Sequence, residues 1–180
     1  MLLHQLGRPF RVVRSSYREV VRLTETPSEN AMRNALGKAR GAHVPAGARG
    51  IVIAADTLLY FRRRVIGKPK TLREAKRLLQ QLSGKSHWVY TGLCLLDPQS
   101  GKIRTSYEKT RVTFTQLAET TLQRLLMRGS PLDKAGGYAL QEDRGDLIRR
   151  FEGSRSNVIG LPLERLRREL RLFHSPAHDF

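Results

Sequence analysis

Apolar residues follow two patterns along this chain, and each pattern predicts a different kind of element. From 72 to 82 they recur every three or four residues, which is typical of a helix with one buried face. From 50 to 54 they run almost without interruption, which is the pattern of a buried strand. The chain therefore holds both helices and strands.

The other elements are marked by their boundaries. Capping boxes at Thr26–Glu29 and Thr71–Glu74 begin helices that run to about Ala39 and to Ser83. Long strands are expected at 88–96 and 103–114, with a turn between them. The remaining elements are a helix end at 2–7, short strands at 10–13, 138–140 and 147–148, a hairpin over 58–66, a helix at 119–127 that stops at Gly129, and a basic helix from Pro162 through Leu170.

Charge and cysteine content narrow the classes of partner and compartment. The 180 residues suit one domain and hold 33 Lys+Arg against 16 Asp+Glu, a net charge of +17. This excess attracts polyanions, so nucleic acids, nucleoside phosphates and anionic membrane surfaces all qualify. The single cysteine, Cys94, excludes an internal disulfide and suits a reducing compartment. No stretch reads as a signal peptide or a membrane span, so we expect a cytoplasmic protein.

Asp56 is the first candidate for chemistry. It follows the apolar run, so we expect it at the carboxyl end of a buried strand, where open α/β sheets place their ligands. There a carboxylate could hold a divalent cation or take a proton from an attacking water. The alternative is an aspartate that starts a turn and hydrogen-bonds to nearby backbone groups. On this residue alone, the turn is favoured.

Lys68 and Lys38 are candidates for phosphate binding. Lys68 stands in a restrained turn between Gly67 and Pro69, and Lys38 lies near the end of its expected helix. Either lysine offers a point charge to phosphate oxygens. In so basic a chain a lysine is more often a solvated surface residue, and Lys38 could instead neutralise the end of its helix.

The segment 133–138 is the most specific one. Its paired glycines permit close backbone approach to a ligand, and Lys134 adds charge. Gln141 offers a donor and an acceptor to a base edge. An ordinary glycine turn is the alternative. Taken with Asp56 and the other lysines, the segment favours an anionic ligand, and a nucleotide in particular.

Several other patterns carry no site. The stretch 83–87 lacks the glycine spacing of a phosphate loop, and it closes a helix instead of opening one. His87 reads as a structural histidine, and the spacing of His and Cys supports no metal cluster. The arginine runs at 62–64, 149–150 and 165–171 read as solvated faces, because aromatic residues are not interleaved with them.

The order of these segments resembles the Maf family of nucleoside triphosphate pyrophosphatases. The resemblance extends from Leu2 almost to Leu170; several of its motifs are weak alone, but jointly they are strong. The matching positions are Leu6-Gly7, Glu19, Leu36–Ala39, Ala55–Thr57, Gly67–Pro69, Leu82–Gly84, His87, Thr91-Gly92, Asp133–Tyr138, Gln141 and Asn157–Pro162.

The resemblance implies an α/β fold in which a mixed, curved sheet with flanking helices forms a ligand cleft between two lobes. It implies a single domain over 1–173, with 174–180 as a disordered tail. The implied reaction hydrolyses a nucleoside triphosphate to the monophosphate and pyrophosphate with Mg²⁺ or Mn²⁺. A homodimer is a further implied possibility, and no membrane partner is expected.

The resemblance also implies roles for individual residues. Asp56 matches the proton acceptor, and Asp56 and Glu19 would hold the metal. Thr57 and Gln141 match positions linked to substrate choice, and a glutamine at the latter indicates the dTTP/UTP branch. The substrate-binding set is Glu19, Lys38, Thr57, Lys68, Lys134 and Gln141.

The sequence departs from the family pattern in two places. Family members begin with a strand and a loop whose Ser-Pro-Arg-Arg stretch contacts the phosphates, whereas this sequence starts inside the expected first helix. We expect either a start codon chosen too late or the loss of half the phosphate cradle, with steeply reduced activity and an unpaired sheet edge. Glu142 and Asp143 also stand where the family usually carries glycine.

Three functions stay open. The first is the pyrophosphatase, and the second is a catalytically impaired nucleotide-binding protein of the same family. The third is a basic nucleic-acid-binding protein, which is ranked last because no recognition motif accompanies the charge.

Overall fold

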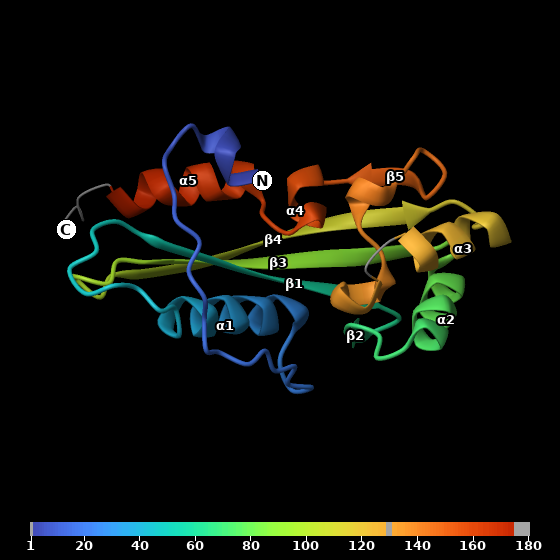
Figure 1. Ribbon diagram of the computed structural model, residues 1–180, viewed down its shortest axis with the longest axis horizontal. Coiled ribbons are helices and arrows are strands. Elements are labelled where there is room, and N and C mark those ends of the chain that lie inside the picture. The colour runs from blue at the N-terminus through green and yellow to red at the C-terminus, as the bar shows by residue number, and fades with distance from the viewer. Residues whose placement is uncertain (1, 129–130, 175–180) are drawn as a thin grey trace. The chain divides into compact units, whose positions relative to one another are not determined.

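The computed structural model describes residues 2–128 and 131–174, which form two compact units (Figure 1). Unit 1 takes its described residues from 1–56, 91–108 and 160–180, and unit 2 from 57–90 and 109–159. The expected helix stop at Gly129 and the tail beyond His174 lie outside the described residues. The single domain over 1–173 and the cleft between two lobes stay predictions.

The strands form one five-stranded sheet in the order β2-β1-β3-β4-β5. The pairings β1–β2 and β4–β5 are antiparallel, and the latter shifts register between Thr113 and Phe114. Together with its flanking helices, the sheet confirms the expected α/β class. The strands are β1 (Val52–Phe61), β2 (Arg64–Ile66), β3 (Ser86–Leu96), β4 (Ile103–Phe114) and β5 (Ile148–Glu152).

The helices predicted at 27–39, 72–82, 119–127 and after Pro162 begin where the sequence indicates, whereas the short helices between 131 and 159 were not predicted. The Thr26 hydroxyl accepts from the Glu29 amide and the Glu29 carboxylate accepts from the Thr26 amide, so the first capping box is complete. Across 2–128 and 131–174, every helix is too short or too polar to cross a membrane. The helical elements are η1 (Leu2–Leu6), α1 (Pro27–Arg40), α2 (Leu72–Leu82), α3 (Glu119–Arg128), η2 (Pro131–Asp133), η3 (Ala135–Gly137), η4 (Leu140–Glu142), α4 (Arg155–Ile159) and α5 (Leu163–His174).

In unit 1, α1 and α5 cover opposite faces of the sheet (Figure 1). Successive β1 side chains alternate between these faces. Ile51, Ile53 and Ala55 join the cluster that contains the α5 side chains, whereas Val52 and Ala54 join the cluster of α1. Position 56 therefore belongs to the face that α1 covers.

Unit 2 has its own hydrophobic core, built mainly from α2, α3 and the adjoining parts of the sheet. His87 lies inside it with 1% exposure, and its Nε2 is 2.7 Å from the Tyr138 hydroxyl oxygen. Burial lowers the pKa of His87 to about 3 and raises the pKa of Tyr138. His87 is thus neutral and structural, as expected.

Two of the short strands predicted from sequence are wrong. Residues 10–13 form no strand, and strand-like pairing within residues 2–26 is confined to the isolated Ser15–Ala42 bridge. Tyr138 has extended backbone angles, but three-residue 3₁₀ helices stand on either side of 138–139. The left-handed Gly136 and Gly137 (φ of 75° and 77°) turn the chain there and prevent a straight ladder.

The expected hairpin is confirmed, with a turn that sequence patterns would not favour. Arg62 and Arg63 occupy the two left-handed positions between β1 and β2 (φ of 49° and 62°). Two-residue hairpin loops of this kind match the twist of the strands but usually hold Asn or Gly. The turn ends β1, which runs as one strand from Val52 to Phe61.

β1 has an open edge over its first half. β2 is only three residues long and pairs with Leu59–Phe61 alone. In the part of the chain that the structure describes, Val52–Ala55 therefore has β3 on one side and no strand on the other.

Candidate active site

The polar core of unit 1 begins with a stripe of residues on α1. Asn30, Asn34 and Lys38 are spaced by four residues and so lie on one helix face. Both asparagines have no exposed surface, and Lys38 keeps 25% of its side chain exposed. Gly92 lets α1 approach β3 closely, because a Cβ there would stand 2.2 Å from the Ala31 carbonyl oxygen.

Asp56 points to the same polar core from the middle of β1, not from the end of a strand as predicted from sequence. The apolar runs before and after it belong to one continuous strand. A carboxylate can sit inside that strand because its two oxygens are paired: Asp56 Oδ1 accepts from Lys38 Nζ at 2.7 Å, and Oδ2 accepts from Asn34 Nδ2 at 2.9 Å. The expected turn-forming alternative is therefore wrong.

Glu19 completes the cluster from the segment that precedes α1. Its Oε1 lies 2.7 Å from Lys38 Nζ, so one ammonium group is shared by two carboxylates. Lys38 also donates to the Ala55 carbonyl oxygen at 3.3 Å. Glu19 is 41% exposed and Asp56 only 2%, so the cluster runs from the protein interior to its surface.

Asp56 and Glu19 stabilise the protonated form of Lys38. Burial alone would lower its pKa, but hydrogen bonds and charge attraction from Asp56 and Glu19 outweigh burial and raise the pKa above its usual value. Lys38 therefore stays protonated through the neutral range. The expected alternative, neutralisation of the helix end, does not describe its contacts.

Asn34 is the functional candidate that sequence reasoning missed. While its amide nitrogen donates to Asp56, its Oδ1 accepts from Tyr17 Oη at 3.1 Å and from the Val20 amide at 3.2 Å. It thereby ties the segment that carries Glu19 to α1 and fixes the Asp56 carboxylate. The four-residue spacing of Asn30, Asn34 and Lys38 was the available signal.

Packing holds the Glu19 segment in this position. Gly37 leaves room for the Tyr17 ring, because a Cβ there would lie 2.3 Å from a ring carbon. Arg33 donates to the Val20 carbonyl oxygen at 2.8 Å and pairs with Glu25 at 2.8 Å. The segment is therefore anchored on both sides of Glu19.

The other expected site residues belong to unit 2. The Gly136 amide donates to the Gly67 carbonyl oxygen at 3.3 Å, which brings the turn of Lys68 next to the glycine turn after Lys134. Lys68 and Gln141 are exposed, Lys134 is half-buried, and Thr57 follows Asp56 in β1. That these four residues share one pocket with Lys38, Asp56 and Glu19 stays a prediction.

Asp143, which departs from the family pattern, has a local role. Its Oδ1 accepts from the amides of Gly145 and Leu147 at 2.8 and 3.0 Å. These contacts stabilise the turn before β5, so the negative charge at this position serves as a hydrogen-bond acceptor for backbone amides.

The carboxylates suit a hydrated magnesium ion better than an all-protein metal cage. Within the described residues, no group of three or more His, Cys, Asp and Glu side chains has an arrangement that could hold a metal ion. Mg²⁺ commonly takes one or two protein carboxylates and obtains its other ligands from water and phosphate. Asp56 and Glu19 supply that number of oxygen donors from one cluster.

Comparison with known proteins gives a consistent result. The family described as "Maf-like protein" matches residues 1–173. A "dTTP/UTP pyrophosphatase" of Bacillus cytotoxicus is 40% identical over 176 residues, covering 98% of this chain and 91% of the relative. Relatives with the same name from Bacillus cereus and Bacillus anthracis are 39% identical over 173 residues, covering 96% of this chain and 84% and 89% of theirs. This chain belongs to the Maf family.

Proposed function

We propose that this protein hydrolyses a nucleoside triphosphate of the dTTP/UTP type to its monophosphate and pyrophosphate. The relatives that bear this activity in their names support the proposal. The structural observation that supports it most directly is the buried Asp56 carboxylate, which Lys38 and Asn34 hold in one orientation. A positioned carboxylate and a secured ammonium group are what attack by water on a phosphoanhydride requires.

Asp56 is the proposed proton acceptor. An ionised carboxylate has about four acceptor sites, and the described contacts to Lys38 and Asn34 use one on each oxygen. A site therefore remains for a water that attacks the α-phosphorus. As the new P–O bond forms, that water gives its proton to Asp56, and the bond to pyrophosphate breaks.

Lys38 is the proposed counter-charge to the phosphates. Its raised pKa keeps it positive, and its partial exposure lets the ammonium group meet a ligand. Asp56 and Glu19 would hold Mg²⁺ or Mn²⁺, which, when bound, neutralises charge on the phosphate oxygens. Glu19 thus serves two proposed purposes, positioning Lys38 and binding the metal.

We also propose roles for four further residues from their chemistry: Lys68, Lys134, Thr57 and Gln141. Lys68 and Lys134 flank adjoining turns and offer further positive charge to the phosphates. We assign Thr57 and Gln141 to the choice of base, because an amide presents a donor and an acceptor side by side. We also propose a cytoplasmic location, where the buried thiol of Cys94 stays reduced.

Pyrophosphate release tests the proposal directly. The intact chain is offered dTTP, UTP, dATP and dCTP with Mg²⁺ or Mn²⁺, alongside Asp56→Asn. We expect release from dTTP and UTP, reduced about 10²–10⁴-fold in Asp56→Asn. Asp97→Asn is the matched control, because Asp97 lies in the turn after β3, where it bonds Gln99 and Ser100.

The outcomes separate the open alternatives. Full activity in Asp56→Asn would refute the proposed role of this carboxylate. Nucleotide binding without pyrophosphate release from the intact chain would instead support the catalytically impaired protein.

A further inference from the structure

The sheet in unit 2 has a second face, opposite the hydrophobic core of that unit. The core takes alternate residues of three neighbouring strands, namely Leu59, Phe61, Val89, Val112 and Phe114. Successive strand side chains point to opposite faces, so the residues between and beside these point away from the core. They include Tyr60 on β1, Trp88 and Tyr90 on β3, and Lys109 and Arg111 on β4, which together we call the aromatic face.

The aromatic face is accessible, and its rings and cations lie close together. Lys109 and Arg111 are exposed and the three rings are half-buried, whereas the core residues on the same strands are at most 8% exposed. The rings of Tyr60 and Tyr90 meet edge to face, with their centroids 6.2 Å apart. Lys109 Nζ lies 5.2 Å from the centroid of the Trp88 ring. Aromatic and basic groups therefore alternate across the strands.

The charge beside the rings is mainly positive. On β5, Glu152 pairs with Arg111 at 3.9 Å and with Arg150 at 3.4 Å. These three side chains are 39%, 44% and 70% exposed, and ion pairs of such exposure contribute little stability. A phosphate can therefore replace Glu152 as the partner of either arginine, and Lys109 adds a third cation.

Rings and cations on one sheet face suit a single-stranded nucleic acid. Unpaired bases stack on aromatic side chains while the phosphates meet basic groups. A duplex keeps its bases stacked inside and cannot use the rings in this way. Lys109 lies over one side of the Trp88 indole, so that side is open to a ligand. Base stacking there contributes more than an exposed cation–π contact, so a base would displace the lysine and leave its ammonium group for a phosphate.

Hydroxyl groups on the same face favour RNA over DNA. Ser86 Oγ and Thr113 Oγ1 lie 2.8 Å apart on the adjacent strands β3 and β4. The phenols of Tyr60 and Tyr90 add two more hydroxyls. Each hydroxyl both donates and accepts hydrogen bonds, so it can bond the 2′-hydroxyl that distinguishes RNA. A sheet whose exposed rings stack two or three bases is a common mode of RNA recognition.

We propose that the aromatic face binds single-stranded RNA, with bases on Tyr60, Trp88 and Tyr90 and phosphates on Lys109 and Arg111. The net charge of +17 adds long-range attraction for the same ligand. The rings and cations come from three strands, so their order in the sequence does not show them interleaved. The proposed hydrolysis uses none of these five residues.

The probe is a uridine dodecamer with a 5′-hydroxyl end and fluorescein at its 3′ end. Fluorescence anisotropy measures its affinity for the intact chain. In a second titration with unlabelled RNA, protein fluorescence reports on Trp88, the only tryptophan in the sequence. We expect saturable binding that quenches Trp88 and weakens with salt. A deoxyuridine dodecamer and a uridine–adenosine duplex should each bind about fivefold more weakly or less.

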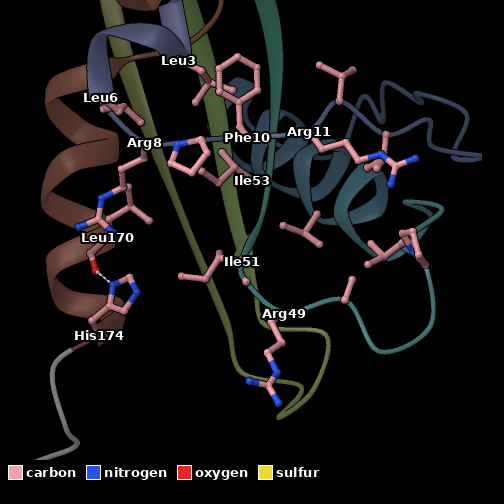
Figure 2. Close-up of a pocket in the computed structure, with 18 residues that line it drawn as sticks. Leu3, Leu6, Arg8, Phe10, Arg11, Arg49, Ile51, Ile53, Leu170 and His174 are labelled. Atoms are coloured by element: carbon pink, nitrogen blue, oxygen red, sulfur yellow. Dashed lines mark hydrogen bonds between the residues drawn. The ribbon is translucent and has the colours of Figure 1, made fainter.

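Two variants separate stacking from charge. Trp88→Thr removes a ring but keeps a good strand former, and it should weaken binding about fivefold or more. Lys109→Gln with Arg111→Gln should lower the slope of log affinity against log salt by about 1.4, since each phosphate contact to a single strand contributes about 0.7. The matched control is Arg8→Gln with Arg49→Gln. These exposed arginines line a cavity of about 580 Å³ in unit 1 (Figure 2), and their loss changes the net charge equally but should leave the slope unchanged.

Other outcomes would overturn the proposal. Unquenched Trp88 at saturating RNA would show that the ring is not used, and this measurement needs no variant. An equal fall of slope in the control would attribute binding to net charge alone, and equal affinity for deoxyuridine would remove the assignment to RNA. Binding that is lost in Lys68→Gln but kept in Trp88→Thr would place the oligonucleotide at the proposed catalytic site. Because the probe carries no triphosphate, its failure to bind leaves the proposed hydrolysis untouched.

Discussion

Replacing Lys38 with methionine removes the charge that joins Asp56 and Glu19 while keeping most of the apolar stem. Asp56 would remain 2% exposed with Asn34 as its described partner and without its counter-charge. Breaking a buried ion pair in this way costs about 3–5 kcal/mol, and an exposed pair contributes about 0–1 kcal/mol. Lys38 is 25% exposed and Asn34 stays bonded, so we expect a loss of about 2–3 kcal/mol in the free energy of unfolding.

The matched control is Lys76→Met. Lys76 pairs with Glu119 on the surface of unit 2, where the two side chains are 40% and 52% exposed. Urea denaturation of both variants at neutral pH gives the comparison. We expect a loss of about 0–1 kcal/mol for Lys76→Met, and for Lys38→Met a fall in Tm of roughly 5–10 °C.

The pH dependence has a defined sign. The folded-state pKa of Lys38 is raised, so its stabilisation is fully present below the unfolded value, about 10.4. It is lost as pH rises through the folded value. The stability curves of wild type and Lys38→Met should therefore converge in strongly alkaline solution. Equal losses in Lys38→Met and Lys76→Met, or a difference that persists undiminished in alkali, would refute the reasoning.

Three further predictions concern packing, protonation and the missed asparagine. Gly92→Ala should cost about 3 kcal/mol or more in chemical denaturation, since its Cβ would strike the backbone of α1, whereas Gly67→Ala, with open space around it, should be nearly neutral. His87 has a folded-state pKa of about 3, so the unfolded chain binds more protons than the folded chain between pH 3 and 6.5, and stability falls as pH drops through that range. The double substitution His87→Phe with Tyr138→Phe should flatten this dependence of stability on pH, and an unchanged slope would contradict the prediction. Asn34→Leu removes the amide that donates to the buried Asp56 carboxylate, so it should lower stability by about 1–3 kcal/mol and reduce kcat more than KM. Unchanged turnover would show that the asparagine does not position the proposed catalytic carboxylate.

Local sequence patterns predicted the helices and strands well where the capping residues and the hydrophobic periodicity indicate the same element. The N-cap residues Thr26 and Thr71 placed the starts of α1 and α2, although the Glu74 carboxylate accepts from the Lys70 amide and leaves the second capping box incomplete. The long strands around the turn at 97–101 are present. The polar pair Asp56-Thr57 misled the sequence reasoning, because its tolerance inside a strand depends on Lys38 and Asn34, which are distant in sequence. The pattern within the strand carries no information about such distant partners.

The candidate site was also predicted only in part from the sequence. The resemblance singled out Glu19, Lys38 and Asp56, and the structure brings these three together. Asn34 was missed because a buried asparagine within a helix looks like any polar residue until its partners are known. The strand expected at 10–13 failed for a related reason: a strand forms only when it pairs with another, and a local pattern does not show whether that pairing takes place.

The alternation of side chains along β1 makes its length important. Asp56 shares a face with Val52 and Ala54, while Ile53 and Ala55 take the opposite one. One inserted residue between Gly50 and Asp56 would rotate the carboxylate toward α5 and bring an aliphatic group opposite the ammonium of Lys38. Two inserted residues would restore the face but displace the acid by about 7 Å along the strand. Insertions within the first half of β1 would therefore disrupt the site, whereas the loop at 44–50 can accommodate an insertion.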